Sequence, residues 1–134
     1  MNKELRLPAS LTNLETFLSF IKEQAQKCGL SDEKINKLEL ASEEALVNII
    51  KHAYPFKDGY IKVNCIEDND SFIVEITDKG IPFNPLSAKE PILDTDIDYR
   101  PIGGVGILLM KKLTDFIEYK RNNNSNLLRL IMHV

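Results

Sequence analysis

The spacing of apolar and polar residues changes along the chain, and each change predicts a different element. Residues 3–8, KELRLP, alternate between polar and apolar side chains, which predicts a short edge strand ending at Pro8. After Ser10, a residue suited to N-capping, apolar residues recur at helical spacing and predict a helix that ends near Gly29. The apolar face of this helix comprises Leu14, Phe17, Leu18, Ile21 and Ala25.

A second helix is predicted between Ser31 and about Ala53, just before Pro55. Ser31 is a suitable N-cap, and a proline two residues beyond the helix end is typical because proline cannot continue a helix. The positions expected to face inward are Ile35, Leu38, Ala41, Ala45 and Ile49.

In the second half of the chain, apolar and polar residues alternate along two pairs of segments, which is the pattern of β-strands. Residues 60–67 and 71–78 alternate, are rich in β-branched side chains and flank a DND segment, which predicts a β-hairpin. Residues 115–122 and 126–134 flank an NNNS segment and predict a second hairpin. Between the hairpins, residues 102–113 (IGGVGILLMKKL) run from glycines into an amphipathic helix.

Residues 82–101 contain four prolines and several acids, and they show no clear period. An irregular segment of this length is uncommon in a compact domain and is usually functional. We therefore expect a lid at about residues 84–102.

The predicted order is strand, two helices, hairpin, loop, helix, hairpin. Helices that are segregated from a mostly antiparallel sheet pack on one of its faces and give an α+β fold, a two-layer α/β sandwich. A length of 134 residues is most simply one domain, spanning residues 1–134.

Composition and charge narrow the functional classes. Apolar residues make up 43% of the chain and charged residues 28%, which is ordinary for a globular protein. The net charge of −3 argues against direct binding of nucleic acid. Cys28 and Cys65 are too few for a disulfide framework or a zinc site and are expected in the core. No apolar run is long enough for a membrane span or signal peptide, so a cytoplasmic protein without membrane contact is expected.

Three polar residues form a stripe on the second helix: Glu44, Asn48 and His52 follow one another at four-residue spacing. A solvated face explains this segment when it is considered alone. Alternatively, the pair Glu44 and Asn48 serves one site, because an amide oxygen suits Mg²⁺ and a carboxylate can accept a proton from an attacking hydroxyl. His52 is more often a structural or capping residue in such a position.

Asp78 and Gly80 end a predicted strand in the segment ITDKGIPF. An ordinary strand exit explains them, since aspartate tolerates turns and glycine supplies unusual backbone angles. The functional alternative is a buried carboxylate that accepts a hydrogen bond from an exocyclic amine such as that of adenine.

The glycines of GGVG, residues 103–106, also have two interpretations. They can relieve crowding where a loop enters a helix, or they can let backbone N–H groups approach an anion at the helix N-terminus. The segment matches neither the P-loop nor the dinucleotide-binding pattern.

The order of these three motifs resembles the GHKL ATPase superfamily, whose domain is the Bergerat-type ATP-binding sandwich. In detail it resembles the bacterial anti-sigma-factor serine/threonine kinases. The segments that carry the resemblance are SEEALVNIIKHAY, ITDKGIPFNP and GGVGILLMKKLTDFIEY. With the leading strand and first helix, the resemblance covers essentially the whole chain.

The resemblance implies a role for each motif. Glu44 would be the catalytic general base, Asn48 would coordinate Mg²⁺, and Asp78 would hold the adenine amino group. Backbone amides at Gly104 and Gly106 would reach the phosphates. The implied ATP-binding residues are Asn48, His52, Asp78, Gly80, Phe83, Arg100, Gly103, Gly104, Val105, Gly106 and Ile107.

Two departures from the family pattern are visible. The family kinases carry an arginine close to the second glycine motif, whereas Pro101 and Ile102 separate Arg100 from Gly103 here. The final strand of the family opens with a Gly-Thr-like element near the adenine, and this chain has SNLLRL instead.

The implied partners are a sigma factor and an anti-sigma-factor antagonist with a phosphorylatable serine, and the implied assembly is a homodimer. The main hypothesis is an ATP- and Mg²⁺-dependent serine/threonine kinase with anti-sigma activity. The alternative is a nucleotide-sensing module that sequesters a partner without phosphorylating it. A third hypothesis is an interaction domain that binds no nucleotide.

Overall fold

The computed structural model describes residues 2–82 and 104–134 and confirms the predicted order of elements. The lid expected at 84–102 lies outside these residues, as do Phe83, Arg100 and Gly103. The elements are β1 (Asn2–Pro8), a 3-10 turn (Leu11–Asn13), α1 (Leu14–Cys28), α2 (Asp32–His52), β2 (Tyr60–Asp68), β3 (Ser71–Asp78), α3 (Gly104–Leu113), β4 (Phe116–Asn122) and β5 (Ser125–His133).

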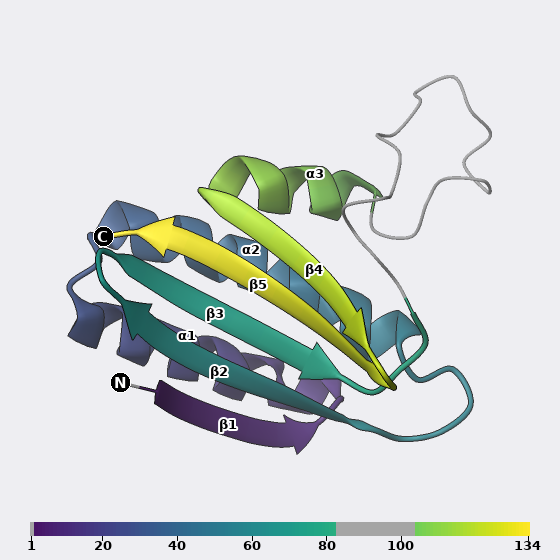
Figure 1. Ribbon diagram of the computed structural model, residues 1–134. Helices are drawn as coiled ribbons and strands as arrows, with labels where there is room; N and C mark the ends of the chain where they lie inside the picture. The colour runs from purple at the N-terminus through teal and green to yellow at the C-terminus, as the bar shows by residue number, and fades with distance from the viewer. Residues whose placement is uncertain (1, 83–103) are drawn as a thin grey trace.

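The five strands form one sheet in the order β1-β2-β3-β5-β4, and every neighbouring pair is antiparallel. Helices α1 and α2 lie behind the sheet as drawn in Figure 1, and α3 packs beside α2. This is the predicted two-layer α/β sandwich. In the second hairpin, β5 pairs with β3 and β4 lies outside it. The edge strands of the sheet are therefore β1 and β4.

Capping residues set the limits of the first two helices. Ser31 accepts a hydrogen bond from the backbone nitrogen of Lys34 at 3.2 Å and starts α2 as predicted. Gly29 adopts a left-handed backbone, with φ of 90°, and ends α1. Ser10 differs from its prediction in one respect, because it caps the short 3-10 turn and α1 itself begins four residues later at Leu14.

The core lies between the sheet and the apolar faces of α1 and α2. Of the positions expected to face inward on α2, only Ile49 is not fully buried, because it lies where the helix borders a pocket. The buried apolar residues of the two helices include Phe17, Leu18, Ile21, Ala25, Ile35, Leu38, Ala41, Ala45 and Leu46.

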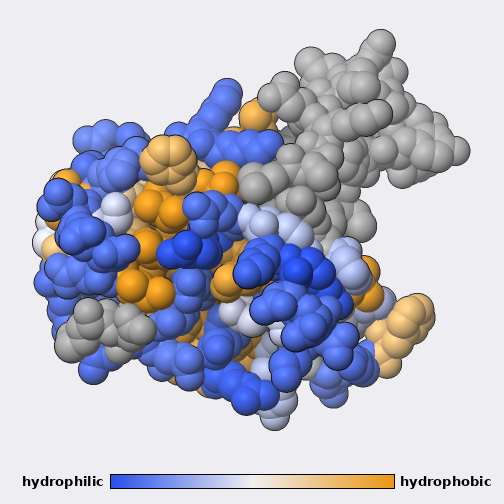
Figure 2. Space-filling model, in the orientation of Figure 1, coloured by the Kyte–Doolittle hydropathy of each residue, from blue (hydrophilic) through white to orange (hydrophobic). Residues whose placement is uncertain are grey.

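The face of the sheet that is turned away from the helices carries an apolar stripe near one end. Ile66, Ile73, Ile131 and Phe116 are in register across β2, β3, β5 and β4, and none of them belongs to the main core. Phe116 is 60% exposed. Figure 2 shows apolar side chains gathered on this face, beside a more polar surface.

Both hairpins turn through an asparagine with a left-handed backbone, Asn69 with φ of 54° and Asn123 with φ of 57°. Asparagine tolerates this conformation, which tight hairpin turns require. None of the helices in the described part of the chain is both long and apolar enough to span a bilayer.

Candidate functional site

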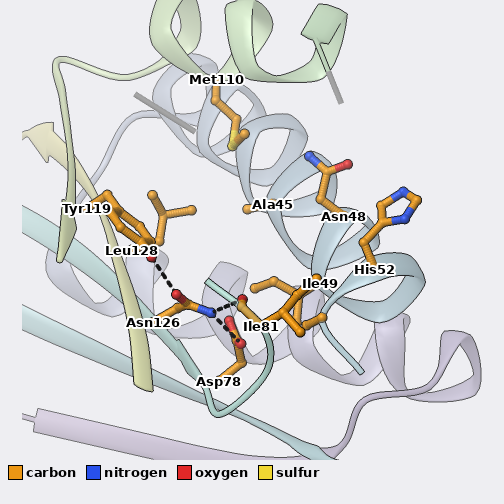
Figure 3. A pocket seen from close by; sticks show the side chains of 11 residues that line it. Ala45, Asn48, Ile49, His52, Asp78, Ile81, Met110, Tyr119, Asn126 and Leu128 are labelled. Carbon is orange, nitrogen blue, oxygen red and sulfur yellow. Dashed lines mark hydrogen bonds between the residues drawn. The ribbon is translucent and has the colours of Figure 1, made fainter. Parts of the chain in front are cut away.

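A pocket lies between the second half of α2, the exit of β3, the β4–β5 hairpin and α3 (Figure 3). Its interior leaves about 70 Å³ for the centres of water-sized molecules, and the empty space reaches about 600 Å³ when the open mouth is counted. The residues that line it are Ala45, Asn48, Ile49, His52, Ala53, Asp78, Ile81, Met110, Tyr119, Asn126 and Leu128.

Asp78 is the acidic group of this pocket and is only 4% exposed. Its Oδ1 atom accepts hydrogen bonds from the backbone nitrogen of Gly80 at 2.8 Å and from Nδ2 of Asn126 at 2.9 Å. Burial raises the pKa of Asp78, while these two hydrogen bonds and the charge of Arg121 oppose the rise. Among residues 2–82 and 104–134, none donates to Oδ2, and Asp78 lines the pocket.

Asn126 is a site residue that the sequence motifs did not single out. It lies opposite Asp78 in the pairing of β3 with β5, and it is 5% exposed. A signal was present in the sequence: Asn126 occupies the inward period of β5, which otherwise carries Leu128, Leu130 and Met132. A polar residue at a core position requires a hydrogen-bonding partner, because burial without one is unfavourable.

The exit of β3 is fixed by contacts to β4 and to the segment at the end of α2. Arg121 donates from Nη1 to the carbonyl oxygen of Gly80 at 2.8 Å, and the backbone nitrogen of Ile81 donates to the carbonyl of Ala53 at 2.9 Å. The hydroxyl of Tyr54 accepts from the backbone nitrogen of Lys79 at 2.8 Å. These contacts hold the turn that carries Asp78 against the end of α2.

Gly80 has a clear packing role in this turn. A Cβ atom placed on it would lie 2.3 Å from the carbonyl oxygen and 2.5 Å from the Cβ of Ala53. The close approach that glycine allows in the described structure is therefore to the backbone of α2. A contact of Gly80 with a nucleotide remains a prediction.

Of the three polar residues that form the stripe on α2, two line the described pocket and one does not. Asn48 and His52 line the pocket, on the side facing away from Asp78 in Figure 3. The Nδ2 atom of Asn48 is buried and has no hydrogen-bond partner among the described residues. Glu44 is half-buried one helical turn away and is not among the described residues that line the pocket.

Helix α3 begins at Gly104, so Gly104, Val105, Gly106 and Ile107 form its first turn. The free backbone N–H groups of a helix N-terminus favour an anion. Farther along α3, Met110 is fully buried and contributes an apolar wall to the pocket.

The donor set fits a magnesium ion that is held mainly by a ligand. Within residues 2–82 and 104–134, no three His, Cys, Asp or Glu side chains gather closely enough to hold a metal by themselves. Mg²⁺ typically takes one or two protein oxygens and completes its shell with phosphates and water. Asn48 lines the pocket, and its amide oxygen is a ligand of the type that Mg²⁺ takes. Its Nδ2 donor, which has no partner among the described residues, suits a phosphate oxygen rather than the metal.

The pocket and fold define a class of protein, and comparison with known families identifies it. Residues 7–132 match the histidine kinase-like ATPase domain, so the chain belongs to this family. The GHKL resemblance that the three motifs indicated is thereby confirmed.

The chain is similar to several proteins named serine-protein kinase RsbW. It is 32% identical over 99 residues to the protein of Listeria monocytogenes, covering 70% of this chain and 63% of the relative. It is 29% identical over 118 residues to the Staphylococcus aureus protein, covering 84% and 74% of the two chains. With the Bacillus pumilus protein the identity is 28% over 127 residues, covering 90% and 78%.

A solved structure shares the fold. The RsbU and RsbW domains of Rv1364c from Mycobacterium tuberculosis align with a TM-score of 0.72 and 15% identity, covering 99% of this chain and 32% of that chain. At this identity the likeness supports the fold alone. The chain spans 63% of the length of the Listeria relative, so activity and partners do not pass to it by similarity.

Proposed function

We propose that this chain is an ATP-binding anti-sigma regulatory factor that phosphorylates a serine of an anti-sigma-factor antagonist. The observation that carries the proposal is that Asp78 and Asn48 line one pocket, and that Oδ2 of Asp78 and Nδ2 of Asn48 have no hydrogen-bond partner among the described residues. The family of the chain supports ATP as the ligand, and relatives named serine-protein kinase support the reaction.

At the base end of the pocket, Oδ2 of Asp78 accepts a hydrogen bond from the adenine amino group. The side chains of Ile49, Met110 and Leu128 supply apolar walls for the ring. An apolar site with one well-placed polar group gives orientation and selectivity.

At the phosphate end, the amide oxygen of Asn48 would bind the magnesium ion, or its amide nitrogen would donate to a phosphate oxygen. His52 lies one turn farther along the same helix. The first turn of α3 presents backbone N–H groups to the phosphates. Magnesium, when bound, supplies positive charge that offsets the charge of the phosphates. Contributions from Phe83, Arg100 and Gly103, and closure of a lid at 84–102, belong to this proposal through the family resemblance.

Glu44 acts as the general base. It accepts the proton of the serine hydroxyl while the serine oxygen forms its bond to the γ-phosphorus and the bond to ADP breaks. Its place one helical turn from Asn48 supports this role, because positioning accounts for most of the catalysis of phosphoryl transfer.

A second candidate function is nucleotide sensing without phosphorylation. It is favoured by one observation, the absence of Glu44 from the described residues that line the pocket. In this case the nucleotide changes the affinity for a sigma factor, and no phosphate appears on the partner.

The proposal also includes a homodimer and a cytoplasmic location. The apolar stripe that ends in Phe116, which is 60% exposed, supports self-association, since exposed apolar surface commonly marks interfaces. Ile66 and Ile131 are half-buried and Ile73 is buried, so Phe116 is the exposed side chain of the stripe. Sedimentation of the wild type and of Phe116→Ser tests the dimer. The variant should have a higher dimer dissociation constant, so it should be monomeric at protein concentrations at which the wild type is dimeric.

Calorimetric titration with ATP, with and without Mg²⁺, tests nucleotide binding. The wild type should bind more tightly with Mg²⁺, and Asn48→Ala should lose this gain. Asn36→Ala, an exposed asparagine of the same helix, is the matched control and should behave as the wild type. Absence of binding under every condition would overturn both nucleotide functions.

Transfer of labelled γ-phosphate to the antagonist protein of the same organism tests the kinase. We expect Glu44→Gln to reduce the rate by about 100-fold or more, which is the range for loss of a general base. Glu43→Gln, at the adjacent half-buried glutamate, is the control. Near wild-type transfer by Glu44→Gln would remove Glu44 from the base role.

A further inference from the structure

The side chain of Asn126 has its hydrogen-bonding capacity committed within the protein (Figure 3). Nδ2 donates to Oδ1 of Asp78 at 2.9 Å and to the carbonyl oxygen of Ile81 at 2.8 Å. Oδ1 accepts a hydrogen bond from the hydroxyl of Tyr119. A primary amide has two N–H donors, so neither is left for a ligand.

This arrangement joins three neighbouring strands at one side of the pocket. Asp78 ends β3, Asn126 lies opposite it on β5, and Tyr119 comes from β4. Because the Tyr119 hydroxyl donates to the amide oxygen, it fixes the orientation in which the amide nitrogen faces Asp78. The reverse orientation would direct the amide oxygen at a carboxylate and a carbonyl, which are both acceptors.

We propose that Asn126 is a specificity-determining, positioning residue that adapts the pocket to a 6-aminopurine, an inference that rests on the proposed ATP function. It holds Asp78 so that Oδ2 alone faces the base edge, and it withholds its own donors from that edge. The site thus offers an acceptor and no amide donor to the group at position 6 of a purine.

The chemistry of the two purine types gives the selectivity. Adenine carries an amino group at position 6, which donates to Oδ2 of Asp78. A 6-oxopurine carries a carbonyl oxygen there, which would face a carboxylate with no donor between them. A buried acceptor left without its donor disfavours the wrong ligand, whereas a free asparagine amide would have accommodated it.

The placement of Asn126 also argues against a purely structural role. The following inward positions of β5 are Leu128, Leu130 and Met132, and a leucine at 126 would continue that apolar face. An asparagine there is compatible with the core only because all its polar atoms are paired. The pairing is made with a residue of the nucleotide pocket and with the turn that follows it.

Titration with Mg·ATP and Mg·ITP tests the inference, since these nucleotides differ in the group at position 6 and in the proton that ITP carries on the adjacent N1. The wild type should prefer ATP. Asn126→Ala should weaken ATP binding by about tenfold or more, the effect of losing one hydrogen bond to a charged group, and should leave ITP binding nearly unchanged. The ratio of the two affinities should therefore fall by about tenfold. Asn122→Ala, at an exposed position at the end of β4, should keep the wild-type ratio.

Tyr119→Phe provides a second, milder test that preserves the aromatic ring in the pocket wall. It should lower the ATP-to-ITP ratio in the same direction by a smaller factor, because the amide then loses its orienting donor. An unchanged ratio in a folded Asn126→Ala, or an equal loss of both nucleotides, would overturn the inference. Tight ATP binding by the wild type alongside that result would leave the proposed function standing, whereas no binding of ATP by the wild type would overturn the proposed function itself.

Discussion

Gly80 lies directly against the backbone of Ala53, the residue that caps the C-terminal end of α2. This contact joins the turn after β3 to the helix that carries Asn48, and so it connects the two halves of the pocket. The backbone hydrogen bond from Ile81 to Ala53, at 2.9 Å, lies immediately beside it.

A methyl group at position 80 should therefore disturb both stability and the site. Gly80→Ala places a Cβ 2.3 Å from a backbone oxygen, which cannot move aside as a side chain can. We expect a loss of about 2 kcal/mol in the free energy of unfolding, together with weaker ATP binding. Urea denaturation and calorimetry measure the two effects. Lys79→Ala, at the exposed neighbouring residue, is the control, and similar stability of both variants would contradict the packing role.

The buried carboxylate of Asp78 should lower stability at neutral pH. Burial raises the pKa of Asp78 in the folded chain, so the folded chain binds this proton more tightly than the unfolded chain does. The free energy of unfolding then falls as pH rises through the folded pKa, and the loss is absent below the unfolded pKa. Asp78→Asn should gain stability relative to the wild type at pH 7 and lose this advantage near pH 4, about the ordinary value for aspartate.

The same variant should lose most of its affinity for ATP at pH 7, because the amide cannot replace the charged acceptor, and the difference from the wild type should shrink near pH 4, where the carboxyl is protonated. Paired measurements of unfolding and of ATP binding at the two pH values check both expectations. A relative stability of Asp78→Asn that is lower at pH 7 than at pH 4 would show that the charge of Asp78 stabilises the fold.

Two leucines of α2 provide a matched pair for the core. Leu38 is fully buried and Leu40 is 49% exposed, although they lie two residues apart. Leu38→Ala should lower the free energy of unfolding by about 2–5 kcal/mol through lost burial and the cavity that remains. Leu40→Ala should change it by about 0.5 kcal/mol. Equal effects in urea denaturation would show that the helix is rotated from its described orientation.

Cys65 should be inert in the folded protein. Burial raises the pKa of its thiol to about 12, so at pH 8 only about one molecule in ten thousand carries the reactive thiolate. Cys28 is half-buried, and burial followed by the charge of Glu67 raises its pKa as well. In Cys28→Ser, alkylation of Cys65 at pH 8 should proceed only after denaturant is added, and rapid alkylation of the native variant would show that the β2 core opens readily.

The sequence predicted the elements well because local signals marked their limits. Gly29 ends α1 and Ser31 begins α2, as predicted. The two hairpins turn at asparagines within the segments that predicted them. The family was also accessible, since three motifs in a fixed order carry the resemblance that the domain match confirms. The roles of the individual site residues stay predictions for the experiments above.

Asn126 shows why the site was only partly predictable. Its inward position in β5 is visible in the alternation of the strand, but its partner Asp78 is 48 residues away in the chain. No local pattern states that these two strands are neighbours. Likewise, the half-buried place of Glu44 outside the described pocket lining depends on how α2 is turned against the sheet.

By itself, then, the sequence determined what each segment forms, through side-chain periodicity and capping, which act over a few residues. The tertiary structure decided that β5 enters the sheet between β3 and β4. A hairpin can dock by either strand, and the choice depends on which apolar face packs against the helices. Because β5 pairs with β3, Asn126 lies beside Asp78. Because β4 pairs with β5, the hydroxyl of Tyr119 can donate to the amide oxygen of Asn126 in the pocket.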